Sequence, residues 1–137
     1  MLKYENLIKQ YPEFFIETAL SVNESCMAFG VECGEGWCRI LEALCLKLKM
    51  LLQENNEPLS VFRFTQIKEK YGTLYIYYKL NYINIPATTK IDNLIQKAEE
   101  DSETICEHCG KQGELYDDGW CITLCINCKR KYKNGFK

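Results

Sequence analysis

Four cysteines near the end of the chain have the residue type and spacing of a metal site. They form two C-x₂-C pairs, Cys106 with Cys109 and Cys125 with Cys128, which are separated by fifteen residues. Zinc prefers four soft ligands in a tetrahedron, and each pair lets two thiolates face one ion. Residues 113–124 are expected to form a hairpin that turns at Asp118-Gly119, because this dipeptide tolerates positive φ angles. The spacing therefore predicts one structural Zn²⁺ in a C-terminal zinc ribbon.

Other states of these thiols fit the pattern less well. Two disulfides or four unliganded thiols are the alternatives, and His108 or Cys121 are alternative ligands outside the paired geometry. Residues 1–20 carry five charged side chains that interrupt any apolar signal segment, and no stretch is long enough to span a bilayer. We therefore expect a cytoplasmic protein with no membrane partner, whose thiols are reduced or bound to metal.

The remaining cysteines do not form a second motif of this kind. Cys26, Cys33, Cys38 and Cys45 contain no C-x₂-C pair, so a second zinc site is the less favoured alternative to core packing. A nucleophilic cysteine normally needs an activating histidine, and the only histidine is His108. The sequence thus predicts a protein that is not an enzyme.

A basic segment follows the last cysteine. Residues 129–137 contain five of the 17 basic residues and none of the 19 acidic ones, so the rest of the chain is acidic. We expect three parts: a core domain over 1–104, the zinc ribbon over 105–128 and a basic tail over 129–137. Such a tail binds phosphates or forms a solvated terminus, and its candidate nucleic-acid contacts are Lys129, Arg130, Lys131, Tyr132 and Lys133.

The elements that must position these residues follow from hydrophobic periodicity. Helices are predicted over 2–10, 12–19, 36–53 and 88–104, with a loop over 21–36. Two alternating segments, 59–67 and 73–80, predict a β-hairpin joined by residues 68–72. The expected fold class is α+β, with helices packed on a small antiparallel sheet and a C-terminal zinc ribbon.

Two further motifs carry a resemblance to a known group. The turn Cys33-Gly-Glu-Gly-Trp37 precedes the strongest helix, and Gln66-Ile-Lys-Glu-Lys-Tyr-Gly-Thr-Leu-Tyr75 follows it. With the terminal cysteines, they resemble small, largely uncharacterised phage and prophage proteins with C-G-D-G-W and Q-V-K-E-K-F-G-T-L-R-F motifs. The similarity covers roughly residues 10–128, and Glu35 and Tyr75 replace the usual aspartate and arginine. It implies a bacteriophage or mobile-element setting and a bacterial host cell, but no reaction.

Three functions are compatible with these observations. The first is a non-enzymatic, host-directed inhibitor, such as an anti-CRISPR-like counter-defence protein, that docks on a host protein or ribonucleoprotein. Its candidate contacts are Glu35, Trp37, Tyr75 and Tyr77, although Trp37 also fits the core stripe of its helix. The second is an RNA-binding protein that uses the basic tail and the tyrosine-rich hairpin. The third, a metal-dependent nuclease near residues 66–69, lacks a converging pair of carboxylates, and residues 68–70 are expected to be a solvated turn.

Overall fold

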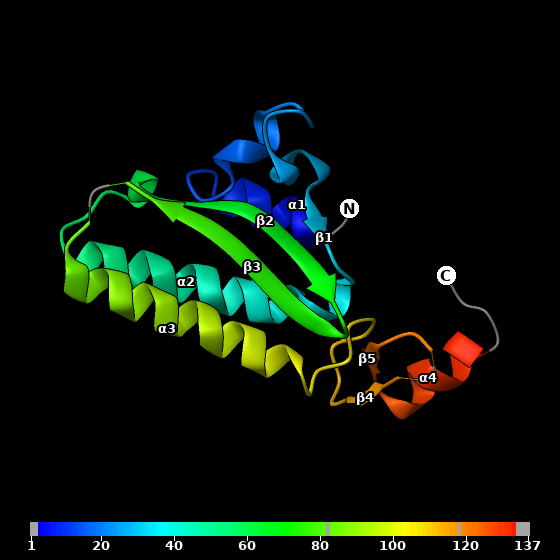
Figure 1. The fold of residues 1–137 in the computed structure, drawn as a ribbon. Helices are drawn as coiled ribbons and strands as arrows, with labels where there is room; N and C mark the ends of the chain where they lie inside the picture. Colours follow the sequence, from blue (N-terminus) through cyan, green and yellow to red (C-terminus); the bar gives the residue numbers. More distant parts are fainter. Residues whose placement is uncertain (1–2, 82, 118, 134–137) are drawn as a thin grey trace.

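The protein is an α+β fold in which a β-hairpin lies across two long antiparallel helices (Figure 1). The structure is a computed structural model that describes residues 3–81, 83–117 and 119–133. The helices are α1 (Lys3–Gln10), α2 (Cys38–Glu54), α3 (Ile85–Ser102) and α4 (Ile126–Lys133). The strands are β1 (Val31–Glu32), β2 (Phe62–Lys70), β3 (Thr73–Leu80), β4 (Glu114–Tyr116) and β5 (Ile122–Leu124). The expected α+β class is confirmed.

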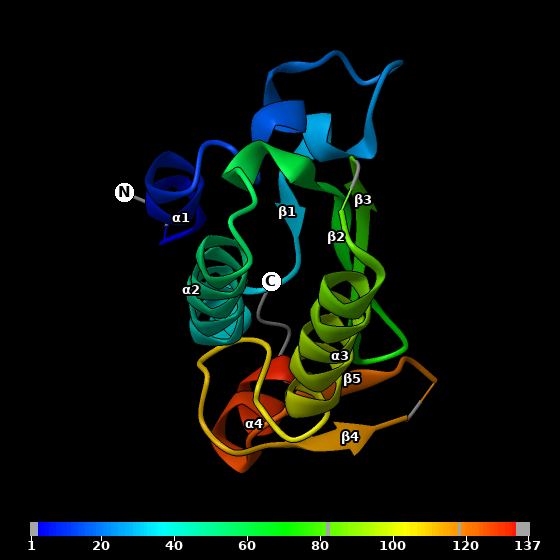
Figure 2. The ribbon, with the colours of Figure 1, turned by 90° about the vertical axis from the view of Figure 1, so that its left-hand side faces the viewer.

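The two long helices pack against one face of the sheet (Figure 2). In α2 the apolar stripe predicted from the sequence is buried, from Leu41 through Leu48 to Leu52. Helix α3 begins at Ile85 rather than at residue 88, because the side chain of Asn84 accepts a hydrogen bond from the backbone N–H of Ala87 at 2.8 Å. These helices and the inner face of the hairpin form one core.

The main sheet has the strand order β1-β2-β3, and its turn differs from the prediction. Strand β1 was expected as loop; it has only two residues and pairs parallel to β2. Strand β2 continues to Lys70, so the expectation of a solvated turn over residues 68–70 is wrong. The turn consists of Tyr71 and Gly72, with φ of 55° and 81°. Two positive φ angles give a turn whose twist matches that of the flanking strands.

A β-bulge at Thr65 and Gln66 sorts the side chains of β2 between the two faces. Phe62, Phe64 and Ile67 are all fully buried, although Phe64 and Ile67 are three residues apart and would point to opposite faces of a regular strand. One extra residue restores the alternation, so all three side chains face the helices. The opposite face, which we call the open face, carries these residues from both strands: Arg63, Thr65, Gln66, Lys68, Lys70, Thr73, Tyr75, Tyr77 and Lys79.

Both edges of the hairpin have hydrogen-bond partners. On the β3 edge, the N–H of Leu74 bonds Ser102 Oγ at 2.9 Å and that of Ile76 bonds Glu99 Oε2 at 3.0 Å, so α3 satisfies this edge with side chains. On the β2 edge, β1 pairs with one end and the carbonyl of Phe14 accepts from the N–H of Phe64 at 2.8 Å.

The N-terminal segment crosses the far end of β2 without forming the helix predicted over 12–19. Only a 3₁₀ turn, Ile16–Ala19, forms there. The carbonyl of Phe14 accepts a hydrogen bond from the edge strand β2 instead of one within a helix. Phe14 and Phe15 are both fully buried against the aromatic core. Tertiary packing thus overrides the local helical pattern.

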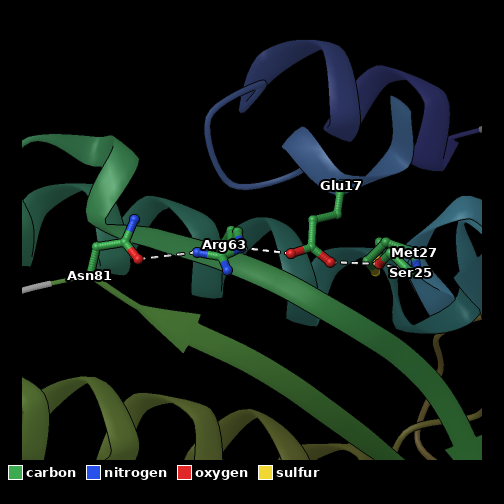
Figure 3. Close-up of polar contacts among 5 residues, drawn as sticks. All are labelled: Glu17, Ser25, Met27, Arg63 and Asn81. Atoms are coloured by element: carbon green, nitrogen blue, oxygen red, sulfur yellow. Dashed lines mark hydrogen bonds and ion pairs between the residues drawn. The ribbon is translucent and has the colours of Figure 1, made fainter. Parts of the chain in front are cut away.

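An ion pair fixes this segment to the sheet (Figure 3). Arg63 donates from Nε to Glu17 Oε2 at 2.6 Å and from Nη1 to Asn81 Oδ1 at 3.3 Å. The second oxygen of Glu17 accepts from the Ser25 hydroxyl at 2.5 Å. Partial burial raises the pKa of Glu17, but the hydrogen bonds and charges of Ser25 and Arg63 outweigh it, so the pKa of this carboxyl is lowered overall.

This network predicts an acid-sensitive contribution to stability. A carboxyl whose folded-state pKa is lowered stabilises the protein above its unfolded pKa, and that contribution is lost as the pH falls through the folded pKa. Glu17→Gln should therefore lower the free energy of unfolding by about 1–2 kcal/mol at neutral pH. The difference should shrink below about pH 4. Urea unfolding at both pH values measures it, with the exposed Glu5→Gln as control; a difference that is constant with pH would contradict the assignment.

Candidate metal centre

The two cysteine pairs meet at one point of the structure. The sulfurs of Cys106, Cys109, Cys125 and Cys128 all lie within 4.8 Å of one another. The Sγ atoms of Cys109 and Cys125 are 3.6 Å apart. In each pair the N–H of the later cysteine points at the sulfur of the earlier one, at 3.4 Å. This cluster can hold a metal ion, as the spacing predicted.

The environment of the sulfurs suits thiolate ligands. Cys106, Cys125 and Cys128 are buried, whereas Cys109 is exposed. The backbone N–H of Cys128 lowers the pKa of the Cys125 thiol to about 7. Burial raises the pKa of the Cys128 and Cys109 thiols. A cation is therefore the partner that would let all four sulfurs be deprotonated together.

The cysteine module, residues 105–133, differs from a simple ribbon in its second half. The predicted hairpin forms from β4 and β5, while Asp118 of the expected turn lies outside the described residues. The second pair belongs to a helix: Cys125 directly precedes α4, and Cys128 lies in its first turn. The module thus consists of three parts: the turn over residues 106–109, which we call the first knuckle, the hairpin of β4 and β5, and helix α4.

The glycine turn, residues 33–37, packs closely against the first knuckle and forms hydrogen bonds with it. The N–H of Gly36 bonds the carbonyl of Glu107 at 2.7 Å, and the N–H of Gly34 bonds its carboxylate at 2.8 Å. A Cβ atom on Gly36 would overlap the carbonyl oxygens of Cys106 and Glu107, and one on Gly34 would overlap that of Glu107. Glu107 lies between two cysteines of the cluster, so this turn holds the cluster against the core. Burial raises the pKa of its carboxyl.

The interpretation of Trp37 as a partner contact is wrong. Its side chain is fully buried, and Nε1 donates to the carbonyl of Ile105 at 2.8 Å, one residue before the first ligand. Glu35 is half-buried, and its carboxylate accepts from the backbone N–H of Lys3 at 3.2 Å. The turn is therefore an internal contact that joins α1, α2 and the cysteine module.

The tip of the hairpin makes a second contact with the module. The Thr123 hydroxyl, on β5, donates to the carbonyl of Gly72 at 2.6 Å, and this bond is buried. A Cβ on Gly72 would stand 2.6 Å from Cδ1 of Leu115 on β4. The main sheet and the module hairpin are thus joined end to end, as the meeting of β3 with β5 in Figure 1 indicates.

The expected basic tail is partly folded. Lys129 is buried, with Nζ 4.5 Å from the ring centre of Tyr116 and 5.8 Å from that of Tyr132. These two candidate nucleic-acid residues therefore contribute to packing in α4. Arg130 and Lys131 are exposed. The side chain of Lys133 and residues 134–137 lie outside the described part.

The other predicted residues lie on the open face or in the core. Tyr77 is exposed and Tyr75 half-buried, on the same side of β3. Cys38 and Cys45 are buried and Cys33 is half-buried, and burial raises the pKa of the Cys33 thiol to about 12. The described residues contain no second metal-binding group. Core packing, as the sequence predicted, is thus confirmed for these three thiols. It is wrong for Cys26, which is exposed.

Two exposed aromatic residues lie beside the module, of which Tyr71 belongs to the tyrosine-rich hairpin and Trp120 was not expected as a functional residue. Trp120 is 65% exposed and Tyr71 is 69% exposed, and both line one cavity. Both residues are next to a turn glycine, Gly119 or Gly72, and neither belongs to a regular apolar pattern. This position could have indicated from the sequence that their side chains are exposed.

Comparison with known proteins gives no relative from which a function can be transferred. No family model, no curated protein and no solved structure matches the chain. None of the helices in the described residues is long and apolar enough to cross a membrane. A function must therefore be inferred from the residues of the site.

The glycine turn gives a testable prediction. Gly36→Ala should lower the free energy of unfolding by about 1–3 kcal/mol, because the added methyl group meets backbone carbonyls that cannot rotate away. Thermal or urea unfolding measures the loss. Glu35→Ala is the matched control, because it changes the same turn without entering the contact. Equal stability of the two variants would argue against the close fit between turn and knuckle.

Proposed function

We propose that the four-cysteine cluster holds one structural zinc ion and that the protein acts by binding rather than by catalysis. Four thiolates about 2.3 Å from zinc have sulfurs about 3.8 Å apart, a spacing compatible with the cluster. They fill the coordination shell and leave no position for a substrate or an activated water. Burial raises the pKa of the Cys33, Cys38 and Cys45 thiols, which supports the same view because protonated thiols are poor nucleophiles.

The zinc proposal predicts the behaviour of the purified protein. It should contain one zinc per chain, and Cys106→Ser should lose most of that metal because three thiolates bind it less tightly than four. The variant should also unfold more easily, since Glu107 connects the knuckle to the core. Metal analysis and urea unfolding provide the measurements, with the exposed Cys26→Ser as control. Reduced wild-type protein that holds another metal, or none, would refute zinc.

We infer that the binding surface is the open face of the hairpin and that the partner is a host ribonucleoprotein contacted through its RNA. One observation carries this proposal: the cross-strand register places lysines beside tyrosines on the sheet face opposite to α2 and α3. Lys68 lies opposite Tyr75, and Lys79 is the second residue after Tyr77 on the same strand. Tyrosine rings stack on bases, and lysines neutralise phosphates.

The charges of this face support a polyanionic partner. Lys68, Lys70 and Lys79 form no ion pair with any described residue. Among the described residues, acidic side chains lie at its margins: Glu17 is paired with Arg63, and Glu32 lies beside Lys68 in the parallel register. Glu24 lines a cavity with Tyr77 and Lys79 at the edge nearest the N-terminal segment. The phage setting implied by the sequence resemblance adds that the ribonucleoprotein is one of the host, as expected of a counter-defence inhibitor.

Binding of labelled single-stranded RNA, measured by anisotropy across a salt series, tests the proposal. The double variant Lys70→Glu with Lys79→Glu should weaken binding by roughly tenfold or more and flatten the salt dependence. The control, Lys9→Glu with Lys90→Glu, makes the same change in net charge on α1 and α3 and should bind like the wild type.

A third variant separates the two basic surfaces. Arg130→Glu with Lys131→Glu reverses the exposed charges of α4 while keeping the metal ligands, which a truncation after Cys128 would disturb. Loss of RNA binding in this variant alone would place the site on α4 and refute the open face. Absence of RNA binding in the wild type would refute the RNA contact and leave direct docking on a host protein.

A further inference from the structure

A second surface lies where the hairpin turn meets the cysteine module. A cavity of about 270 Å³ is lined by Glu69, Tyr71, Gly119, Trp120 and Cys121. Tyr71 comes from the turn between β2 and β3, whereas Trp120 comes from the connection between β4 and β5. The contact between Gly72 and Thr123 holds these two turns together. The cavity is therefore built by two folded parts whose relative position is fixed.

The two aromatic side chains that line this cavity are both largely exposed. Tryptophan and tyrosine bury large areas when they can, and both are enriched in binding sites where one side is apolar and the other polar. Here each ring keeps about two-thirds of its surface exposed, although a hydrophobic core is within reach of both turns. Two such rings that line one cavity indicate a site for a ligand with a flat or cationic group.

The charge at the cavity distinguishes between these ligands. Glu69 is the charged side chain among the lining residues, and it faces the helix side of β2, away from the lysines of the open face. Its Oε2 accepts from the N–H of Gly72 at 2.8 Å, and it forms no ion pair within the described part of the chain. A carboxylate held in this way favours a cation and repels a phosphate.

The same chain pairs cations with tyrosine rings elsewhere. Lys129 lies over Tyr116, and Lys70 lies 5.8 Å from the centre of Tyr71 and 5.5 Å from that of Tyr75. A cation over an aromatic face is attracted by the ring quadrupole, most strongly over tryptophan. Trp120, with Tyr71 and Glu69, thus forms a site with two aromatic faces and one negative charge.

We propose that this cavity binds the cationic head group of an arginine side chain from a protein partner. Arginine suits the site better than lysine, because its planar guanidinium stacks on an aromatic ring while its N–H groups bond a carboxylate. The site adjoins the open face at Lys70, which lies near the ring of Tyr71, but its lining side chains are different and the charge among them is negative. A ribonucleoprotein offers both kinds of contact, RNA for the open face and a basic protein surface for this cavity.

The two tryptophans of the chain make the experiment direct. In a ¹⁵N–¹H correlation spectrum, Trp120 and the buried Trp37 each give one indole signal. We would titrate the full chain with the capped peptide Gly-Gly-Arg-Gly-Gly and, as a matched probe, the same peptide with neutral citrulline. The arginine peptide should shift the Trp120 signal saturably at millimolar concentrations and leave that of Trp37 unchanged. The citrulline peptide should not.

Variants of the protein complete the test. Glu69→Gln keeps an acceptor for the N–H of Gly72 but removes the charge, so it should weaken arginine-peptide binding severalfold; Glu5→Gln, an equal charge change on α1, should not. Trp120→Leu should also weaken binding, followed there through the amide signals around Tyr71. Equal binding of both peptides, no effect of Glu69→Gln, or a larger Trp120 shift with adenosine monophosphate would overturn the proposal. RNA binding by the wild type is measured in a separate experiment. Either proposal, the RNA contact of the open face or the arginine site, can therefore be refuted without refuting the other.

Discussion

The close approach between the glycine turn and the first cysteine knuckle determines how the two parts of the molecule fit together. Gly34 and Gly36 bring backbone N–H groups to Glu107, and no side chain can be added there without displacing a carbonyl of the knuckle. Tight backbone contacts of this kind have one arrangement, because there is no flexible side chain to adjust. The position of the sulfur cluster relative to the core follows from this contact.

The contact also explains how the four-cysteine cluster and a conventional core are joined in one small chain. Tyr4 of α1 donates to the carbonyl of Gly34, and Trp37 at the start of α2 donates to Ile105. Hydrogen bonds thus join α1 to the glycine turn and the start of α2 to the module. Metal binding, which orders the knuckle, is expected to contribute to the stability of the whole protein through these bonds.

The sequence was most informative where local chemistry is strong. The cysteine spacing identified all four members of the sulfur cluster, and the periodicity of α2 identified the face that is buried. It was least informative where distant residues meet: β1 is too short to carry a pattern, and the segment predicted as a helix at 12–19 instead gives the carbonyl of Phe14 to β2. Trp37 shows the same limit, because its hydrogen bond to Ile105 spans 68 positions in the sequence.

The protected edges of the hairpin restrict how this protein can recognise anything. Partners often join a sheet by adding a strand, which reads backbone groups and tolerates many sequences. Here the side chains of Ser102 and Glu99 occupy that position along Leu74 to Ile76, and β1 with Phe14 occupies it along β2. Recognition by the hairpin therefore depends on side chains rather than on backbone. Its specificity can change by single substitutions on an otherwise constant scaffold.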